Sequence, residues 1–292
     1  MLRKTLSSTL LLAAAIFAGS AVAESSADQS TQHIQHIRNA TIKVNYGETT
    51  FLIDPMLSDK GSYPGFEGSY RSELRNPLVD LPMAAEDVIA GTDAVIVTHT
   101  HLDHWDDAAQ QLLPKDIPLF VQNAEDAETI RSQGFNDVRI LDSQAEFGGV
   151  TLNKTGGQHG SDEIYAVPEL AQALGQIMGV VFQAEGQKTT YVVGDTVWRD
   201  EVAESLEHYR PDIIVLNIGA AEFNGFEGDP IIMGKEDSLR VHRAAPDATI
   251  IGVHMDAVNH MTLSREELAE FVQKEGIEQH VSIPADGEVI SF

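Results

Sequence analysis

The chain has 292 residues, which is enough for one large domain or two small ones with a sizeable core. It carries 45 acidic residues against 19 Lys and Arg, a formal net charge of −26, and no cysteine. Such an acidic surface disfavours nucleic acid as a partner, because it would repel the phosphate backbone. Without cysteine there are no disulfides or thiolate ligands, so any metal site must consist of His, Asp or Glu.

The N-terminus has the pattern of an export signal. Arg3-Lys4 precedes an apolar run over Leu10–Phe17, and Ala21-Val22-Ala23 fits the small-x-small cleavage rule. We expect a signal peptide over 1–23, cleaved after Ala23, and a small polar disordered tail over 24–32. The apolar run is too short for a membrane span, so no stable membrane anchor is expected. The sequence thus predicts a periplasmic or secreted protein.

The remaining residues, 33–292, predict a single domain that opens with strands and then alternates strands and helices. The predicted strands are 33–46, 49–54, 93–98, 117–122, 137–141, 146–154, 177–184, 189–193, 213–216, 249–253 and 281–283. The predicted helices are 106–113, 124–133, 201–209, 235–244 and 264–274. The apolar runs 93–97 and 212–216 require burial on both sheet faces. Two sheets packed face to face with helices outside, an α/β sandwich, meet this requirement.

Three irregular segments interrupt this alternation: 56–81, 161–175 and 220–234. The first carries aromatic residues together with Arg71 and Arg75, which argues against plain disorder. We weigh two interpretations of it: a lid or wall over a site, or the contact of a homo-oligomer. The two arginines could hold an anionic substrate, and surface ion pairing is the alternative.

The segment Thr98–Asp106 concentrates ionisable side chains directly after an apolar strand. It contains His99, His101, Asp103 and His104. A strand end followed by a helix start presents such side chains from a rigid backbone. A lone histidine is more often an ordinary polar side chain, but this cluster without a cation would crowd unpaired donors. The pattern therefore predicts a metal site.

Further polar residues follow other predicted strands. They are His159, Asp195, Asn217 and His254. Because strand ends at one sheet edge form the sites of layered α/β proteins, we expect these residues near the histidine cluster. Asn217 is a candidate donor to an oxyanion, with a strand-end cap as the alternative. Asn259 and His260, beyond His254, are candidates for substrate binding and catalysis, with support of His254 as the alternative.

The complete pattern resembles the ligand series of the metallo-β-lactamase superfamily. It consists of His99-x-His101-x-Asp103-His104, then His159, Asp195 and His254. The resemblance covers roughly residue 33 to the C-terminus. It implies a four-layer αββα sandwich, with two mixed sheets flanked by helices and metals at one edge. Segments 54–57, 75–82 and 254–260 are similar to the L-ascorbate-6-phosphate lactonase branch.

The resemblance also implies a role for each ligand. The first metal would be held by His99, His101 and His159. The second metal would be held by Asp103, His104 and His254. Asp195 would bridge the two metals. Asp103 would hold the attacking hydroxide and Asp195 would pass a proton to the leaving group. With one metal bound, Asp103 or His104 would instead act as a base. All the ligands are N or O donors, which suits zinc, manganese or iron. Zinc is the first candidate, and the spacing does not choose among the three.

These observations predict a metal-dependent hydrolase that directs a metal-activated hydroxide at a lactone, an ester or a related small substrate. One alternative is phosphodiester or phospholipid hydrolysis at the same centre, which the negative charge disfavours. Another is a non-catalytic metal-binding scaffold, which the complete ligand set disfavours. Substrate specificity is expected to reside in the three irregular segments.

Overall fold

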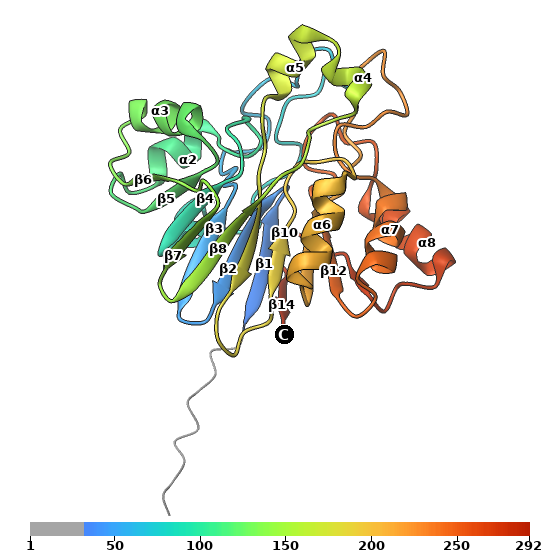
Figure 1. The fold of residues 1–292 in the computed structure, drawn as a ribbon. Coiled ribbons are helices and arrows are strands. Elements are labelled where there is room, and N and C mark those ends of the chain that lie inside the picture. Colours follow the sequence, from blue (N-terminus) through green and yellow to red (C-terminus); the bar gives the residue numbers. More distant parts are fainter. Residues whose placement is uncertain (1–31) are drawn as a thin grey trace, which may run out of the picture.

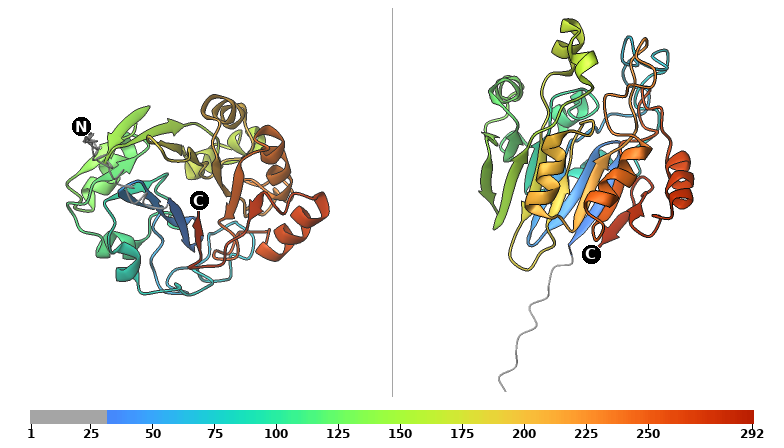
Figure 2. Two further views of the ribbon diagram at one scale, coloured as in Figure 1. Left: turned by 90° about the horizontal axis from the view of Figure 1, so that it is seen from below. Right: turned by 45° about the vertical axis from the view of Figure 1, so that its right-hand side comes forward.

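Two seven-stranded sheets pack face to face, with helices on their outer faces (Figures 1 and 2). The structure is a computed structural model that describes residues 32–292. The predicted signal peptide and tail, except Gln32, lie outside the described residues. The four-layer αββα sandwich with two mixed sheets is therefore confirmed. Across residues 32–292, no helix has the length and apolar character that a membrane span requires.

Each sheet contains both parallel and antiparallel neighbours. In spatial order the first sheet is β14 (Val289–Ser291), β1 (His33–Arg38), β2 (Thr41–Tyr46), β3 (Thr49–Ile53), β4 (Ala94–Val97), β5 (Leu119–Val121) and β6 (Val138–Ile140). The second sheet is β13 (Val281–Ser282), β12 (Thr249–Val253), β11 (Ile213–Asn217), β10 (Thr190–Val192), β9 (Gly179–Gln183), β8 (Val150–Thr155) and β7 (Gln144–Phe147). The parallel pairs include β3 with β4, β10 with β11, and β11 with β12. Their carboxyl ends provide the edges on which a site can form.

The helices lie on three sides of this sandwich. They are α1 (Ala85–Ile89), α2 (Asp107–Leu112), α3 (Ala124–Ser132), α4 (Asp162–Tyr165), α5 (Pro168–Leu174), α6 (Asp200–Tyr209), α7 (Lys235–Ala244) and α8 (Arg265–Glu275). Side chains of α1, α2 and α3 pack on the first sheet, and those of α6, α7 and α8 pack on the second. Helices α4 and α5 stand beyond the strand ends (Figure 1).

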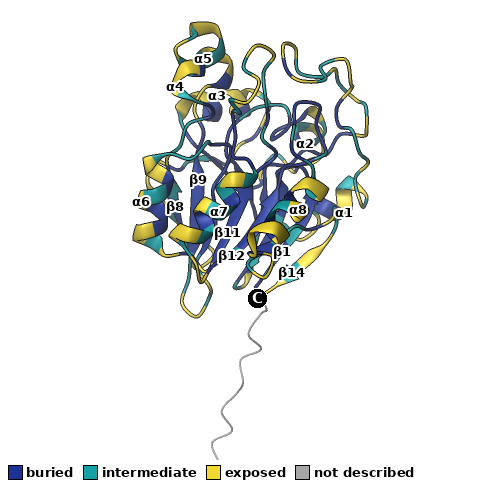
Figure 3. Cartoon of the chain, turned by 90° about the vertical axis from the view of Figure 1, so that its right-hand side faces the viewer, coloured by how far each residue is buried: buried dark blue, intermediate teal, exposed yellow. Residues whose placement is uncertain are grey.

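The apolar runs alternate between two clusters, as burial on both faces requires. In β3, Phe51 and Ile53 join the core between the sheets, whereas Leu52 joins the core beneath α1, α2 and α3. In β4, Ile96 faces the inter-sheet core and Val95 faces the helices. Burying each such side chain contributes about 1.5–3 kcal/mol. Figure 3 shows the buried strands between helices that are exposed on their outer faces.

Several predicted boundaries were wrong, each for a local reason. The predicted strand 33–46 is the hairpin β1–β2, which turns at Asn39 with a φ of 59° that asparagine tolerates. The predicted strand 146–154 is largely the hairpin β7–β8, which turns at Gly148-Gly149, both at positive φ. The segment 161–175 holds α4 and α5; Ser161 caps α4 by accepting from the backbone N–H of Ile164. Helix α1 and strand β14 were not predicted.

One glycine allows two loops to approach closely at the strand ends. A Cβ built on Gly219, just after β11, would lie 2.1 Å from the carbonyl oxygen of His254 and 2.3 Å from Sδ of Met261. We expect Gly219→Ala to lower the free energy of unfolding by about 1–3 kcal/mol, because backbone must move to relieve the overlap. Urea unfolding measures this loss. Gly156→Ala is the control, since its Cβ would make only ordinary 3.5 Å contacts. Equal unfolding midpoints for the two variants would contradict the expectation.

Candidate metal centre

The predicted ligands lie on loops that leave the ends of four strands. His99 to His104 follow β4, His159 follows β8, Asp195 follows β10, and His254 follows β12 directly. Both sheets therefore contribute to one site at the edge of the sandwich beside α5 (Figure 1). His254 has a φ of 65°, an uncommon conformation for a non-glycine residue that the surrounding contacts must hold.

The seven predicted ligands come together in three overlapping groups, in each of which the donor atoms lie within 4.8 Å of one another. The groups are His99, His101 and His159; His99, His104 and Asp195; and Asp103, His104 and His254. The first and third groups have the membership predicted for the two metals. Asp195 Oδ2 lies 3.1 Å from Nε2 of His104, 3.4 Å from that of His254 and 3.6 Å from that of His159. A single oxygen of Asp195 thus faces both groups, which is compatible with the predicted bridging role.

The ring orientations fit bound cations. His159 Nδ1 bonds to the carbonyl of Ile231 at 2.9 Å, which leaves Nε2 free to act as a ligand. His101 Nε2 bonds to the carbonyl of Ala173 at 2.9 Å, which leaves Nδ1 free. His99 Nε2 is buried without a hydrogen-bond partner, and the residue as a whole is only 2 % exposed. A buried unpaired nitrogen is costly, and a divalent cation would satisfy it.

Asp54, which was not assigned a role from the sequence, organises the ligands from behind. Its carboxylate accepts hydrogen bonds from the backbone N–H and the hydroxyl of Thr98, both at 2.7 Å, and contacts Nδ1 of His104 at 2.9 Å. The Thr98 hydroxyl in turn lies 3.1 Å from Nδ1 of His99. Asp54 thereby sets the orientation of two ligand rings. The sequence did indicate that Asp54 follows a predicted strand, and the pairing of β3 with β4 places it next to the histidine cluster.

Charge is unevenly distributed among these side chains. Burial acts to lower the pKa of His104, but the carboxylates of Asp195, Asp103 and Asp54 raise it well above the usual value. Burial also acts to raise the pKa of Asp195, yet His104 and His254 hold it well below its usual range. Burial lowers the pKa of His159 to about 4. Without metal, His104 is therefore expected to be protonated, with Asp54 at Nδ1 and Asp195 at Nε2.

This proton makes metal binding pH-dependent. His104 must be neutral to act as a ligand, so binding should release about one proton per protein near neutral pH. Because the metal-free state binds the proton, apparent affinity should increase with pH, by up to about tenfold per unit. Calorimetric titration of zinc in buffers of different ionisation enthalpy measures the released proton. The same heat in all buffers would contradict the assignment of the proton to His104.

Asn217 and Asn259, which were predicted to bind substrate, bond to other side chains and loops of the protein. Asn217 Nδ2 donates to Oδ1 of Asp195 at 2.5 Å, so it orients the bridging carboxylate. Asn259 is fully buried and its side chain bonds to segment 66–76. Neither residue is among those lining the cavity described below. His260, predicted to be catalytic, does line it, and burial lowers the pKa of its ring to about 4.

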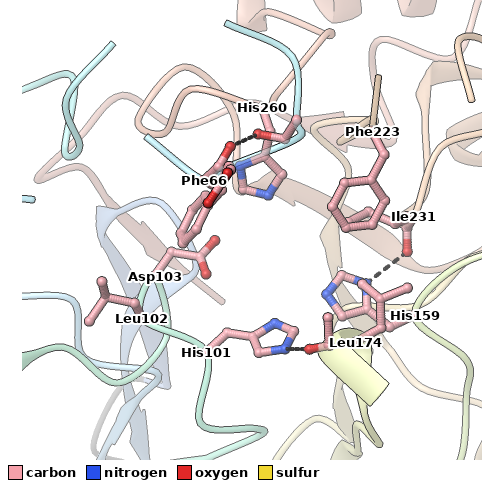
Figure 4. Close-up of a pocket in the computed structure, with 12 residues that line it drawn as sticks. Phe66, His101, Leu102, Asp103, His159, Leu174, Phe223, Ile231 and His260 are labelled. Atoms are coloured by element: carbon pink, nitrogen blue, oxygen red, sulfur yellow. Dashed lines mark hydrogen bonds between the residues drawn. The ribbon is translucent and has the colours of Figure 1, made fainter. Parts of the chain in front are cut away.

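A cavity of about 240 Å³ opens onto the metal ligands. Its lining residues are Phe66, Glu67, Ser69, His101, Leu102, Asp103, His159, Ala173, Leu174, Phe223, Ile231 and His260. Figure 4 shows Asp103 and the rings of His101, His159 and His260 around one opening, with Phe66 beside His260. Half of the lining side chains are aliphatic or phenyl groups, and none of the described lining residues is Lys or Arg.

The arginines of segment 56–81 are occupied elsewhere. Arg71 donates to the carbonyls of Asn259 and Met261, each at 3.1 Å. Arg75 donates to the carbonyls of Gly61 and Ser62, each at 2.8 Å. Both guanidinium groups therefore fasten the segment itself and do not line the cavity. The hypothesis that they hold an anionic substrate is wrong for this arrangement.

Comparison with known proteins identifies the family. Residues 49–255 match the family described as the β-lactamase superfamily domain. The chain belongs to the β-lactamase superfamily. This confirms the superfamily predicted from the ligand series, whereas the narrower resemblance to the lactonase branch stays a prediction.

Relatives and solved structures agree with this membership. The UPF0173 protein YddR of Bacillus subtilis is 47% identical over 260 residues, 89% of this chain and 100% of YddR. A possible metal-dependent hydrolase from Veillonella parvula is 50% identical, with a TM-score of 0.89, over 90% of this chain and 100% of that one. A structure described as isothiocyanate hydrolase from Delia radicum gut bacteria is 49% identical, with a TM-score of 0.86, over 89% of this chain and 99% of that one. The chain is thus a metal-dependent hydrolase of the β-lactamase superfamily.

Proposed function

We propose that this enzyme hydrolyses small, neutral, largely apolar electrophiles, and that isothiocyanates are its substrates. The observation that carries the proposal is the cavity, which joins the metal ligands to a wall that includes Phe66, Phe223 and Leu174. A neutral apolar group fits this wall, whereas an anion would meet the carboxylates of Glu67 and Asp103 and no Lys or Arg among the described lining residues. The relative from Delia radicum gut bacteria, described as isothiocyanate hydrolase, supports the choice of this electrophile.

The chemistry requires only water as co-reactant. The oxygen of water adds to the central carbon of R–N=C=S and gives a thiocarbamic acid. Cleavage of its C–N bond then releases carbonyl sulfide and the amine R–NH₂, so that both protons of water end on nitrogen and nothing is oxidised. Divalent ions held by the seven ligands would supply a water of lowered pKa next to the cavity.

The chain's own side chains are placed to bind and orient the reactants. Asp103 lines the cavity, and its carboxylate can accept a hydrogen bond from the attacking water. Asp195 has Oδ1 held by Asn217, so its Oδ2 keeps a fixed direction toward the ligand histidines. His260 lines the cavity, and Nδ1 of its ring has no hydrogen-bond partner in the protein. We assign His260 to contact with the nitrogen or sulfur of the substrate.

Neutral lactones and esters are the second candidate class, favoured by the resemblance of segments 54–57, 75–82 and 254–260 to the lactonase branch. They share an electrophilic carbonyl and need the same activated water. Phosphodiesters and phospholipid headgroups are disfavoured, because the chain has a net charge of −26 and the cavity lining carries Glu67 and Asp103 without a Lys or Arg among its described residues.

A panel of substrates tests the proposal. Zinc-loaded protein is assayed with benzyl isothiocyanate, a neutral lactone, a phosphodiester and a β-lactam, and the amine and carbonyl sulfide are quantified. We expect equal amounts of both products from the isothiocyanate. The matched control is benzyl isothiocyanate bearing a para-carboxylate, for which we expect a lower kcat/KM. Turnover of another class alone, or preference for the carboxylate, would overturn the proposal.

We further propose two divalent ions, most simply zinc, and a location outside the cytoplasm. The first proposal is supported by the two three-residue groups joined by Asp195. The second is supported by the predicted signal peptide over 1–23. N-terminal sequencing of the protein from the periplasmic fraction should begin at Glu24; an intact Met1 in a cytoplasmic fraction would reject the location.

A further inference from the structure

Hydrogen bonds of the Asn259 side chain connect the loop after β12 to the segment that forms one wall of the cavity. Its Oδ1 accepts from the backbone N–H of Phe66 at 3.0 Å and from Nδ2 of Asn76 at 2.8 Å. Its Nδ2 donates to the hydroxyl of Ser69 at 2.9 Å and to the carbonyl of Tyr70 at 2.7 Å. The side chain thus uses all of its hydrogen-bonding capacity within residues 66–76. A residue so occupied has no group left for a substrate.

Asn76 bonds to Asn259 twice. Oδ1 of Asn76 accepts from the backbone N–H of Asn259 at 2.8 Å and its Nδ2 donates to Oδ1 of Asn259, so one side chain holds both the backbone and the side chain of Asn259. Arg71 adds a bond from Nε to the carbonyl of Asn259 at 3.1 Å. All three residues belong to, or contact, a segment without regular helices or long strands. Its position therefore depends on these bonds, and on backbone bonds from Tyr70 to Glu222 and from Asn224 to Gly68, rather than on a helix or a long strand.

The segment carries one wall of the cavity. Phe66 packs edge-to-face against the ring of His260, with centroids 4.8 Å apart and planes at 86°. Phe66, Glu67 and Ser69 all line the cavity (Figure 4). Because the backbone of Phe66 is bonded to Asn259, the residue before His260, a shift of this asparagine would move the phenyl ring relative to the histidine.

The metal ligands are anchored separately. The backbone N–H of His254 donates to the carbonyl of Asn39 at 2.9 Å, and Asn39 Nδ2 donates to the carbonyl of Asp103 at 3.0 Å. His104 and His99 are held through Asp54 and Thr98. Loss of the Asn259 side chain should therefore loosen the wall and leave the ligands in place.

We propose that Asn259 is a positioning residue that holds Phe66 against His260 and thereby sets the fit of the substrate. This inference rests on the proposed function for its kinetic consequence, while its structural consequence does not depend on any substrate. The bond from Asn259 to Phe66 fixes the cavity wall, and the wall selects by shape. Its loss acts on KM more than on kcat, because binding contacts weaken while the metal-ligand geometry remains.

The test compares Asn259→Ala and Asn259→Asp with Arg75→Ala. The aspartate variant keeps the acceptor for Phe66 and Asn76 but sets a buried carboxylate oxygen against the carbonyl of Tyr70, to which Nδ2 donates in the native protein. Arg75 bonds to the carbonyls of Gly61 and Ser62 in the same segment, away from the cavity. Hydrogen exchange is followed in residues 63–72 and in the ligand segment 98–106, together with bound zinc and the kinetics of benzyl isothiocyanate.

We expect faster exchange over 63–72 in both Asn259 variants, unchanged exchange over 98–106 and unchanged zinc. KM should rise about tenfold or more in both variants, with kcat within about threefold of wild type. Arg75→Ala should leave KM unchanged. Unchanged exchange over 63–72, lost zinc, or a fall in kcat alone would overturn the inference. If wild type turns over no isothiocyanate, the proposed function fails, and the exchange data alone decide the role of Asn259.

Discussion

Asp195→Ala should give a protein that binds at most one metal ion and has lost nearly all hydrolytic activity. The Asp195 carboxylate faces Nε2 of His104, His254 and His159 at 3.1 to 3.6 Å, so it is the one ligand shared by both predicted metal positions. Even loss of an outer partner of a ligand typically weakens metal affinity about 10- to 100-fold. We therefore expect a loss of more than about 100-fold in affinity for at least one ion. Elemental analysis after dialysis measures the metal directly.

Two variants separate this effect from general damage. Asp137→Asn removes a partly exposed carboxylate that bonds to Arg139 beside β6, so metal content and kcat/KM should stay at the wild-type level. Asn217→Ala removes the donor that orients Asp195 and should give an intermediate loss. Wild-type metal content in the Asp195→Ala protein would remove Asp195 from the role of bridge.

Asp54→Asn is the second change for which we expect a large effect. The carboxylate serves three donors, the backbone N–H and hydroxyl of Thr98 and Nδ1 of His104, whereas an amide offers one acceptor oxygen. Asparagine tolerates the φ of 47° at this position, so the change tests hydrogen bonding rather than backbone strain. Metal affinity should fall about 10- to 100-fold. Competition with a fluorescent zinc chelator measures the dissociation constant.

The matched control for Asp54 is Asp93→Asn. Asp93 also accepts a backbone hydrogen bond, from Thr50 at 2.9 Å, but this contact lies at the other end of β3 and β4. Its replacement should leave the zinc dissociation constant unchanged. Equal affinities in the wild-type and Asp54→Asn proteins would show that the ligand rings keep their orientation without this carboxylate.

The metal ligands could be predicted from the sequence because each one follows a recognisable strand. His99 to His104 form a dense pattern after a strand whose residues are apolar on both faces, and each remaining ligand also follows a strand. Parallel pairing of β3 with β4, and of β10, β11 and β12, then places these strand ends together. The layer order follows from the same apolar runs, since they need cover on both faces.

The residues that orient the ligands and the cavity wall, such as Asn217 and Asn259, could not be assigned these roles from the sequence. The partners of Asn259 lie 183 to 193 residues away in the chain, and Asn217 and Asp195 meet only because β10 and β11 are neighbours. A polar side chain at a strand end looks the same in sequence whether it faces substrate or another side chain. The cavity likewise depends on segments 56–81, 161–175 and 220–234, whose conformations carry no simple period.

The most direct test of the account is the rate of benzyl isothiocyanate hydrolysis during titration of the metal-free protein with zinc. Chelator-treated protein should be inactive, and activity should return with added zinc until about two equivalents are bound. The Asp195→Ala protein should not recover activity. Full activity after complete removal of metal, or zinc-loaded protein that releases neither carbonyl sulfide nor amine, would contradict the proposed metal-dependent hydrolysis of isothiocyanates.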